Sequence, residues 1–428
     1  MVLLIIVLAA LLLAAGVPFF ASLAVPVLAA LAIYMPDIGL NIVFHKMFNG
    51  VSVFALLAVP FFIFAAEIIV RGSMAHRLVD FVQRLVGHLP GGMAMTTIVS
   101  CTFFGAVSGS TQATVAAIGG VMYPAMLKAG YQRRFILGLI VNSSDIALLI
   151  PPSIAMIIFA VVTSTSVGAL FIGGFGPGIV LAIAFMMYAY KRAKKFDIPR
   201  TPRTTLPQLW RAFLHTAWAA GVPVIIIGGI YSGVFTPTEA AGVSTVYAIF
   251  VEILIYRSLV PADVYRAAVK SATVTGLIFL VVSGASAMTW LLIVSGVPQA
   301  ISQAVVAYVP SPIYFLMLMN FVLFIACMFI DPISVLLIFM PIFFPAAVTM
   351  GINPIHLGIL VVTNIAIGSA TPPFGIDLFT ASSIFKVRFS EVASGALPFV
   401  GIAVIVLIII TYVPGITLFL PRLLLGIK

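Results

Sequence analysis

Four short segments of this 428-residue chain combine hydroxyl, amide or carboxylate side chains with glycine or proline. The segments cover residues 105–111, 142–153, 329–334 and 364–377, and none of them contains His, Cys or Met. Side-chain and carbonyl oxygens are hard ligands, which suit Na⁺ better than a transition metal. The segments therefore predict Na⁺ sites beside a pocket for a second solute.

The carboxylates in these segments differ in their surroundings. Asp145 and Asp331 lie in long apolar stretches, where an ionisable side chain is costly and usually functional. Asp377 lies closer to Lys386 and Arg388, and its simplest interpretation is a carboxylate in contact with solvent. The predicted Na⁺ ligands are Ser108, Ser110, Asn142, Ser143, Asp145, Asp331, Ser334, Asn364, Gly368 and Thr371. The predicted substrate-binding residues are Ser108, Asn142, Ser153, Asn364, Thr371 and Pro372.

For each single serine the alternative role is close helix packing, together with small neighbours such as Gly105. Since the four segments contain no Lys or Arg, an anionic substrate would be held by half-helix N-termini, amides and bound cations. Glu67 lies one turn before Arg71 and is expected to pair with it. Glu239 is expected to form a capping box with Thr236.

The composition places these segments in a membrane protein. Of all residues, 63% are apolar and 7% are charged, whereas roughly a quarter of a soluble domain is charged. This composition excludes an ordinary soluble enzyme, and the length allows roughly a dozen helical spans of about 20 residues. The net charge of +10 comes from short basic clusters typical of cytoplasmic loops, and not from a nucleic-acid-binding surface. Cys101 and Cys327 lie in apolar runs and are expected to be buried and unpaired.

An internal repeat organises the chain. A shift of about 221 residues relates Ser110 to Asp331 and carries one Pro-Pro pair onto the other. Residues 71–84 hold three arginines, while their counterpart, residues 295–309, holds none. Because basic loops stay in the cytoplasm, equivalent loops are expected on opposite sides of the membrane. The two halves therefore form an inverted repeat.

Each half needs two unusual elements to position its polar segments. Residues 91–127 and 311–348 are expected to be re-entrant hairpins. Residues 135–172 and 354–385 are expected to be spans broken at the paired prolines, because irregular backbone at membrane depth requires protein or water around it. Residues 1–34 allow either one long span or two short ones.

Enzyme and channel interpretations find little support. The chain contains no H-E-x-x-H or G-x-S-x-G motif. Gly284-Ala-Ser286 matches an intramembrane serine protease motif only over a few letters. A channel needs identical filter segments from several chains, whereas two related halves favour alternating access. A membrane-embedded enzyme and a channel subunit stay as alternatives to a carrier.

The four polar segments are similar to those of the large membrane subunit (DctM-like permease) of tripartite ATP-independent periplasmic (TRAP) transporters. The stretches that carry the resemblance are residues 105–110, 142–153, 233–241 and 370–375. The resemblance implies Na⁺-coupled import of an organic acid across the bacterial inner membrane, with two or more Na⁺ ions and no organic cofactor. Sialic acid is expected ahead of C4-dicarboxylates, and a stand-alone ion-coupled anion carrier is the alternative.

The resemblance also implies partners and a division of the chain. A small four-helix membrane subunit and a periplasmic substrate-binding protein are expected as separate chains. Elevator-type motion would carry the hairpins and broken helices past a scaffold, with a basic cytoplasmic linker at residues 191–211. The expected parts are scaffold helices in 1–70, an arm, hairpin and broken helix in 71–172, scaffold helices in 173–270, a second arm, hairpin and broken helix in 271–391, and a C-terminal helix in 392–428.

Overall fold

The computed structural model describes residues 1–195 and 202–426, and every regular element in this part is a helix. The N-terminal elements are α1 (Val2–Ala14), α2 (Phe19–Tyr34), α3 (Asn41–Val51), the 3-10 helix η1 (Phe54–Leu57) and α4 (Ala58–Arg71). The first repeat comprises α5 (Met74–Val86), α6 (Gly92–Ser108), α7 (Thr111–Lys128), α8 (Arg133–Leu149), α9 (Ile154–Thr163) and α10 (Val167–Lys195).

The second part of the chain repeats this order after a group of long helices. The connecting elements are α11 (Leu206–Pro223), the π-helix η2 (Val224–Gly228), α12 (Gly229–Tyr231), α13 (Pro237–Phe250), the π-helix η3 (Val251–Ile255) and α14 (Pro261–Val294). The second repeat comprises α15 (Val297–Tyr308), α16 (Pro312–Cys327), α17 (Pro332–Thr349), α18 (Pro354–Ser369), α19 (Ile376–Phe385), α20 (Phe389–Tyr412) and α21 (Gly415–Leu425).

Seven of the described helices are long and apolar enough to cross a membrane, and the bent pair α8 and α9 makes an eighth candidate. Several further apolar helices, including α6, α16, α18 and α19, are too short to qualify alone. These short helices are the arms of hairpins and the halves of broken helices. The number of spans expected from chain length alone, roughly a dozen, is therefore larger than the number of helices that can cross the membrane singly. The expected all-helical membrane fold is confirmed.

The repeat is visible in the helix boundaries. Helices α7 and α17 begin 221 residues apart, and so do α8 and α18. Ser110 and Asp331 occupy the equivalent N-cap positions of α7 and α17, and each side chain accepts a hydrogen bond from a backbone N–H three residues later. The two residues that end α9 and α19, Ser164 and Lys386, both have positive φ angles. The predicted correspondence therefore extends to local backbone geometry.

Both predicted helix breaks are present. Helix α8 is bent by 42° from α9, and the break holds the cis pair Pro151-Pro152. The equivalent break between α18 and α19 holds the cis pair Pro372-Pro373. Proline has no N–H to donate and disfavours a helical residue before it, so two prolines in a row end a helix. Two hairpins and two broken helices, one of each per repeat, follow from the sequence as expected.

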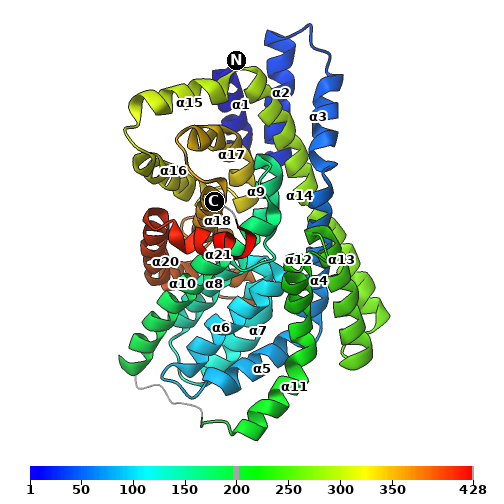
Figure 1. The fold of residues 1–428 in the computed structure, drawn as a ribbon, viewed down its shortest axis with the longest axis vertical. Helices are drawn as coiled ribbons and strands as arrows, with labels where there is room; N and C mark the ends of the chain where they lie inside the picture. Colours follow the sequence, from blue (N-terminus) through cyan, green and yellow to red (C-terminus); the bar gives the residue numbers. More distant parts are fainter. Residues whose placement is uncertain (196–201, 427–428) are drawn as a thin grey trace.

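Each broken helix ends against the hairpin of the other repeat. Helix α9 packs on α17, and α19 packs on α7. Equivalent aromatic pairs mark the two contacts: Tyr123 stacks on Phe385 with ring centroids 4.6 Å apart, and Phe159 meets Phe344 edge-on at 6.3 Å. Figure 1 shows α6 and α7 toward one end of the long axis and α16 and α17 toward the other. The packing of each broken helix on the hairpin of the other repeat brings polar segments of both repeats together.

The remaining long helices pack beside this centre. Helix α14 packs on α2, α3 and α4, and α13 packs on α4. Helices α1 and α2 are separate and pack on each other, so residues 1–34 form two short helices and not one long span. Helix α10, most of which lies in the expected scaffold part 173–270, packs on α6, α8, α18 and α20. Residues 196–201 of the expected linker and 427–428 of the C-terminal part lie outside the described residues.

A buried carboxylate ties α5 to the long helices. Glu252, in η3, is fully buried and accepts hydrogen bonds from the backbone N–H groups of Ser73 at 3.1 Å and Met74 at 2.8 Å. It also accepts from the hydroxyls of Ser73 and Ser258. The first N–H groups of a helix have no partner within the helix, so Glu252 satisfies the start of α5 from another element.

Candidate functional site

A cavity of about 490 Å³ lies where the two hairpin tips meet the long helices. The tip between α6 and α7 contributes Ser108, Ser110 and Thr111, and the tip between α16 and α17 contributes Asp331. Much of the remaining wall is apolar and comes from α4, α9, α14 and α19. Pockets of this size, mostly apolar with a few polar groups, are typical of small-molecule sites, which span roughly 300–1,000 Å³. The structure thus brings three predicted site residues, Ser108, Ser110 and Asp331, to one cavity.

The hairpin tips hold their polar groups through local hydrogen bonds. The hydroxyl of Ser110 donates to Gln112 Oε1 at 3.0 Å. The hydroxyls of Ser108 and Thr114 lie 3.2 Å apart. At the other tip the Ser334 hydroxyl donates to Asp331, while the Ser334 N–H donates to Asp331 Oδ1 at 3.1 Å. Each cap orients oxygen atoms at the start of a helix, where the backbone dipole is positive.

A second group of oxygen atoms is buried within the broken helices and lacks hydrogen-bond partners among the described residues. On α8 these atoms are Asn142 Oδ1, Ser143 Oγ and both carboxylate oxygens of Asp145. On α18 the atom is Asn364 Oδ1. All four side chains are fully buried. Buried polar atoms are normally satisfied, and an unpaired carboxylate is especially costly. Their chemistry fits a cation with oxygen ligands, as the sequence predicts.

The amide nitrogens of the two asparagines are satisfied, so their oxygens are the free groups. Asn142 Nδ2 donates to the Gly138 carbonyl at 2.9 Å. Asn364 Nδ2 donates to the backbone and side-chain oxygens of Asn320, at 2.9 and 3.1 Å. Ser100, on the neighbouring α6, adds a further buried hydroxyl without a partner in the described chain. Ser100 was missed from sequence because a serine in an apolar helix also suits helix packing.

The expectation for Asp377 was wrong. Instead of facing solvent, its side chain is fully buried between the two repeats. Its Oδ1 accepts from Thr111 of α7 at 2.7 Å, and its Oδ2 accepts from Ser369 at 2.6 Å. Helix α19 packs back against α7, so Asp377 is carried into the interior although charged residues follow later in the chain. Asp145 is close enough to Asp377 for their charges to interact.

The other predicted site residues line the two breaks or the helices beside them. Ser153 caps α9 by accepting from Met156 N at 3.4 Å. Thr371 donates to the Ile367 carbonyl at 2.6 Å, and Pro372 follows it in the second break. Gly368 lies so close to Cys327 that a Cβ atom would overlap its side chain. Nine of the predicted site residues do not line the cavity at the hairpin tips: Asn142, Ser143, Asp145, Ser153, Ser334, Asn364, Gly368, Thr371 and Pro372.

Among the described residues, one cationic side chain lines this cavity, although the four polar segments contain no Lys or Arg. Lys270, on α14, lines the cavity together with Glu67 of α4. Lys270 Nζ lies 2.5 Å from Glu67 Oε1, and Arg71 Nε lies 3.4 Å from Glu67 Oε2. The predicted pairing of Glu67 with Arg71 is thus confirmed, and Lys270 adds a second partner. The pair was missed because its residues are distant in sequence and outside the four polar segments.

Two other sequence expectations concern groups away from the cavity. Glu239 and Thr236 form the predicted capping box, with the Thr236 N–H donating to Glu239 Oε2 at 2.8 Å and the Glu239 N–H donating to Thr236 Oγ1 at 3.3 Å. Cys101 and Cys327 are both buried and free, as expected. Ser286, in the protease-like motif, donates to the Val282 carbonyl at 2.8 Å within its own helix.

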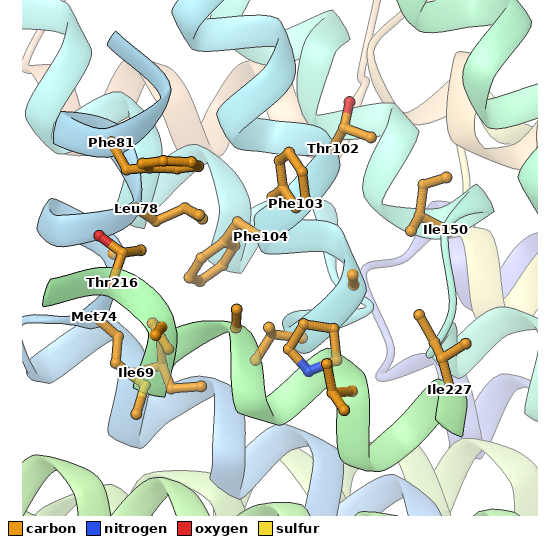
Figure 2. Close-up of a pocket in the computed structure, with 18 of the residues that line it drawn as sticks. Ile69, Met74, Leu78, Phe81, Thr102, Phe103, Phe104, Ile150, Thr216 and Ile227 are labelled. Carbon is orange, nitrogen blue, oxygen red and sulfur yellow. The ribbon is translucent and has the colours of Figure 1, made fainter. Parts of the chain in front are cut away.

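A second cavity, of about 680 Å³, has a different character (Figure 2). Phe81, Phe103 and Phe104 lie on its walls, with Met74 and Ile69 nearby. Among the described residues that line it, two threonines supply the hydroxyl groups. Because ionic solutes need charged or hydrogen-bonding partners, this cavity is unsuited to an organic acid. The cavity at the hairpin tips is therefore the better candidate site.

Comparisons with known proteins agree with this architecture. The model of the family described as "Tripartite ATP-independent periplasmic transporter, DctM component" matches residues 5–416. The chain is 47% identical to the ectoine/5-hydroxyectoine TRAP transporter large permease protein UehC of Ruegeria pomeroyi, over 88% of each chain. It is 39% identical to the C4-dicarboxylate TRAP transporter large permease protein DctM of Rhodobacter capsulatus, over 96% of each chain.

A solved structure shares the fold at low sequence identity. The YdaH transporter of Alcanivorax borkumensis superimposes with a TM-score of 0.59 at 14% identity, covering 92% of this chain and 97% of its own. The matched family, the apolar spans and the two related halves identify a transport protein rather than an enzyme, located in the bacterial inner membrane. The chain belongs to the DctM family, the large permease component of tripartite ATP-independent periplasmic transporters.

Proposed function

We propose that this permease imports a small organic acid or zwitterion together with Na⁺. The proposal rests mainly on fully buried oxygens of α8 and α18 that have no hydrogen-bond partner among the described residues: those of Asn142, Ser143, Asp145 and Asn364. In a membrane interior such atoms need a partner, and a small monovalent cation satisfies several oxygens at once. Two or more Na⁺ ions held there and at the hairpin caps would link ion binding to the geometry of both repeats.

We propose that the solute occupies the cavity between the hairpin tips. Ser110 and Asp331 cap the two helices that begin at this cavity, so the backbone N–H groups of α7 and α17 point toward its edge. Thr111, which also lines the cavity, donates to Asp377. This hydrogen bond joins the buried carboxylate of the second broken helix to the wall of the solute cavity.

The moving part would consist of the two hairpins and the two broken helices, with α10 and α20 attached. The supporting observation is the exchange of contacts between repeats, α9 on α17 and α19 on α7, which joins these elements into one unit. Helices α4 and α14 complete the cavity from the other side. Displacement of the unit along α4 and α14, an elevator-type motion, would expose the cavity to one side of the membrane at a time.

The solute is proposed from the relatives and from the cavity. Named relatives carry ectoine or C4-dicarboxylates, and both solute types have a carboxylate group. Sialic acid, favoured from overall sequence likeness, also has a carboxylate and stays a prediction. The family is tripartite, which supports a small membrane subunit and a periplasmic substrate-binding protein as partners.

The test is uptake into proteoliposomes that contain the full chain and its membrane partner, with the binding protein added outside. Labelled ectoine, succinate and sialic acid would be compared under an inward Na⁺ gradient and under a proton gradient alone. We expect uptake of at least one solute only with Na⁺ and only with the binding protein. Uptake driven by protons alone would reject the ion assignment, and Asp331 would become the first proton-carrier candidate. Uptake without the binding protein would favour a stand-alone carrier.

A further inference from the structure

The charged groups on the cavity wall form an unusual set. Of the described residues that line the cavity, three are charged: Glu67, Lys270 and Asp331. Asp331 is engaged by the N–H and hydroxyl groups of Ser334 at the hairpin tip. Glu67 and Lys270 face the hairpin tips from α4 and α14. The wall opposite the hairpins thus presents one negative and one positive group side by side.

The contacts of Glu67 and Lys270 allow the two side chains to separate. Glu67 also has Arg71 as a partner, with Arg71 Nε 3.4 Å from Oε2, on the oxygen that Lys270 does not use. The Glu67 side chain is only 13% exposed, whereas that of Lys270 is 55% exposed. Lys270 can therefore turn to a solute while Glu67 stays in place with Arg71 beside it. A flexible four-carbon stem with a compact charge suits this movement.

This arrangement discriminates between solute charge types. A dianion would bring two negative groups into a cavity that already holds Glu67 and Asp331 and only one lining cation. A zwitterion would place its carboxylate at Lys270 and its cationic group at Glu67, which replaces the contact between the two side chains with two new ones. Charge complementarity of this kind provides specificity mainly by rejecting the wrong partner.

We propose that Glu67 and Lys270 form a recognition pair that selects a zwitterionic solute carrying one carboxylate and one cationic group. This proposal rests on the proposed function, since it assigns the solute class of the same cavity. The pair acts on the solute itself, independently of the buried oxygens on α8 and α18. It therefore predicts a change of solute preference, without a change of Na⁺ requirement, when either charge is removed.

The experiment measures solute affinity on the full chain with its membrane partner subunit, in saturating Na⁺ and without the binding protein, which has a selectivity of its own. Ectoine is the zwitterionic probe and succinate is the dianionic probe. The unfolding temperature of the protein is measured at increasing concentrations of each probe, and the affinity is taken from the rise in that temperature. The variants are Lys270→Gln, Glu67→Gln and Lys270→Arg. Arg266→Gln is the matched control, because Arg266 lies one turn earlier on α14, pairs with Asp263 and does not line the cavity.

We expect wild type to prefer ectoine, with about tenfold weaker ectoine binding in Lys270→Gln and in Glu67→Gln. Lys270→Arg should retain most of the affinity, and Arg266→Gln should match wild type. Equal or tighter binding of succinate by wild type would overturn the proposal, as would unchanged ectoine affinity in both Gln variants. Na⁺-driven uptake by the same variants in proteoliposomes, with the binding protein added outside, separates the two ideas, because its absence in wild type would reject the proposed function instead.

Discussion

Thr111 donates a hydrogen bond of 2.7 Å to Asp377 Oδ1, and thereby links the tip of the first hairpin to the second broken helix. The two residues are separated by 266 positions in sequence, and both are buried. Ser369 donates to the other carboxylate oxygen at 2.6 Å. The three side chains therefore form a polar connection between the repeats, within the part of the chain that we propose to move as a unit.

Thr111→Val tests this connection with little change of shape. The substitution removes one of the two donors to a buried carboxylate, so we expect a loss of about 2 kcal/mol in unfolding free energy and slower uptake. Thr363→Val is the control, since the buried Thr363 hydroxyl only donates to the Ile359 carbonyl in its own helix. Thermal unfolding in detergent compares the two variants. Equal stability would show that the link contributes nothing of its own.

Asp145→Asn tests the buried oxygen cluster on α8. An amide binds Na⁺ less well than a carboxylate, so we expect the Na⁺ concentration for half-maximal thermal stabilisation to rise about tenfold, a change of about 1.4 kcal/mol. Ser144→Ala is the control, because the Ser144 hydroxyl donates to the Ile140 carbonyl at 2.7 Å and is already satisfied. An unaltered Na⁺ response in Asp145→Asn would remove this residue from the ion sites.

Asp331→Ala separates helix capping from ion binding. Loss of the cap should cost about 1 kcal/mol of stability, and loss of the carboxylate should abolish uptake. Asn353→Ala is the matched control, because Asn353 caps the neighbouring α18 by accepting from Ile355 N at 2.9 Å and does not line the cavity. Both variants should lose similar stability, whereas only Asp331→Ala should lose transport. Near-normal uptake by Asp331→Ala would leave that residue with a capping role alone.

Glu252→Ala tests the attachment of α5 to η3. The variant leaves the N–H groups of Ser73 and Met74 buried without a partner, so we expect a loss of about 3 kcal/mol in unfolding free energy. Glu239→Ala removes the same side chain from an exposed capping box and should cost about 1 kcal/mol. Chemical denaturation measures the unfolding free energy of both variants. A similar loss of unfolding free energy in the two would contradict the role of Glu252 in holding the start of α5.

Gly109→Ala tests how closely the first hairpin tip approaches the first break. Gly109 has a φ of +57°, and an added Cβ atom would overlap the Pro152 carbonyl oxygen. We expect a loss of at least about 2 kcal/mol, from the left-handed backbone and the displaced contact. Gly120→Ala, on α7 with open space around it, should be neutral or stabilising by up to about 1 kcal/mol. Thermal unfolding distinguishes the two, and equal midpoints would contradict the close approach.

The sequence predicts the fold well where local chemistry decides it. Paired prolines end helices in most surroundings, so both breaks could be placed from the sequence. Asp145 could be assigned to the protein interior because a carboxylate within a long apolar stretch is costly and usually functional. These predictions need only the residue and its immediate neighbours in the chain.

The sequence fails where contacts join distant helices. Burial of Asp377 depends on α19 packing against α7, which no local pattern reveals. The approach of Lys270 to Glu67 depends on how α14 lies against α4, and the two residues are far apart in the chain. The satisfied donors and free oxygens of Asn142 and Asn364 likewise required coordinates, because an asparagine in a helix gives no sign of which atom is paired.

The unequal caps of the two repeats have an electrical consequence. Ser110 has a hydroxyl where its counterpart Asp331 has a carboxylate, so the second hairpin tip brings one ionisable group to the proposed moving unit that the first tip lacks. A charge that crosses the whole membrane field changes its energy by about 2.3 kcal/mol for each 100 mV. With a negative cell interior, the voltage would push an Asp331 carboxylate without Na⁺ outward, and so would favour return of the empty second hairpin tip after each delivery.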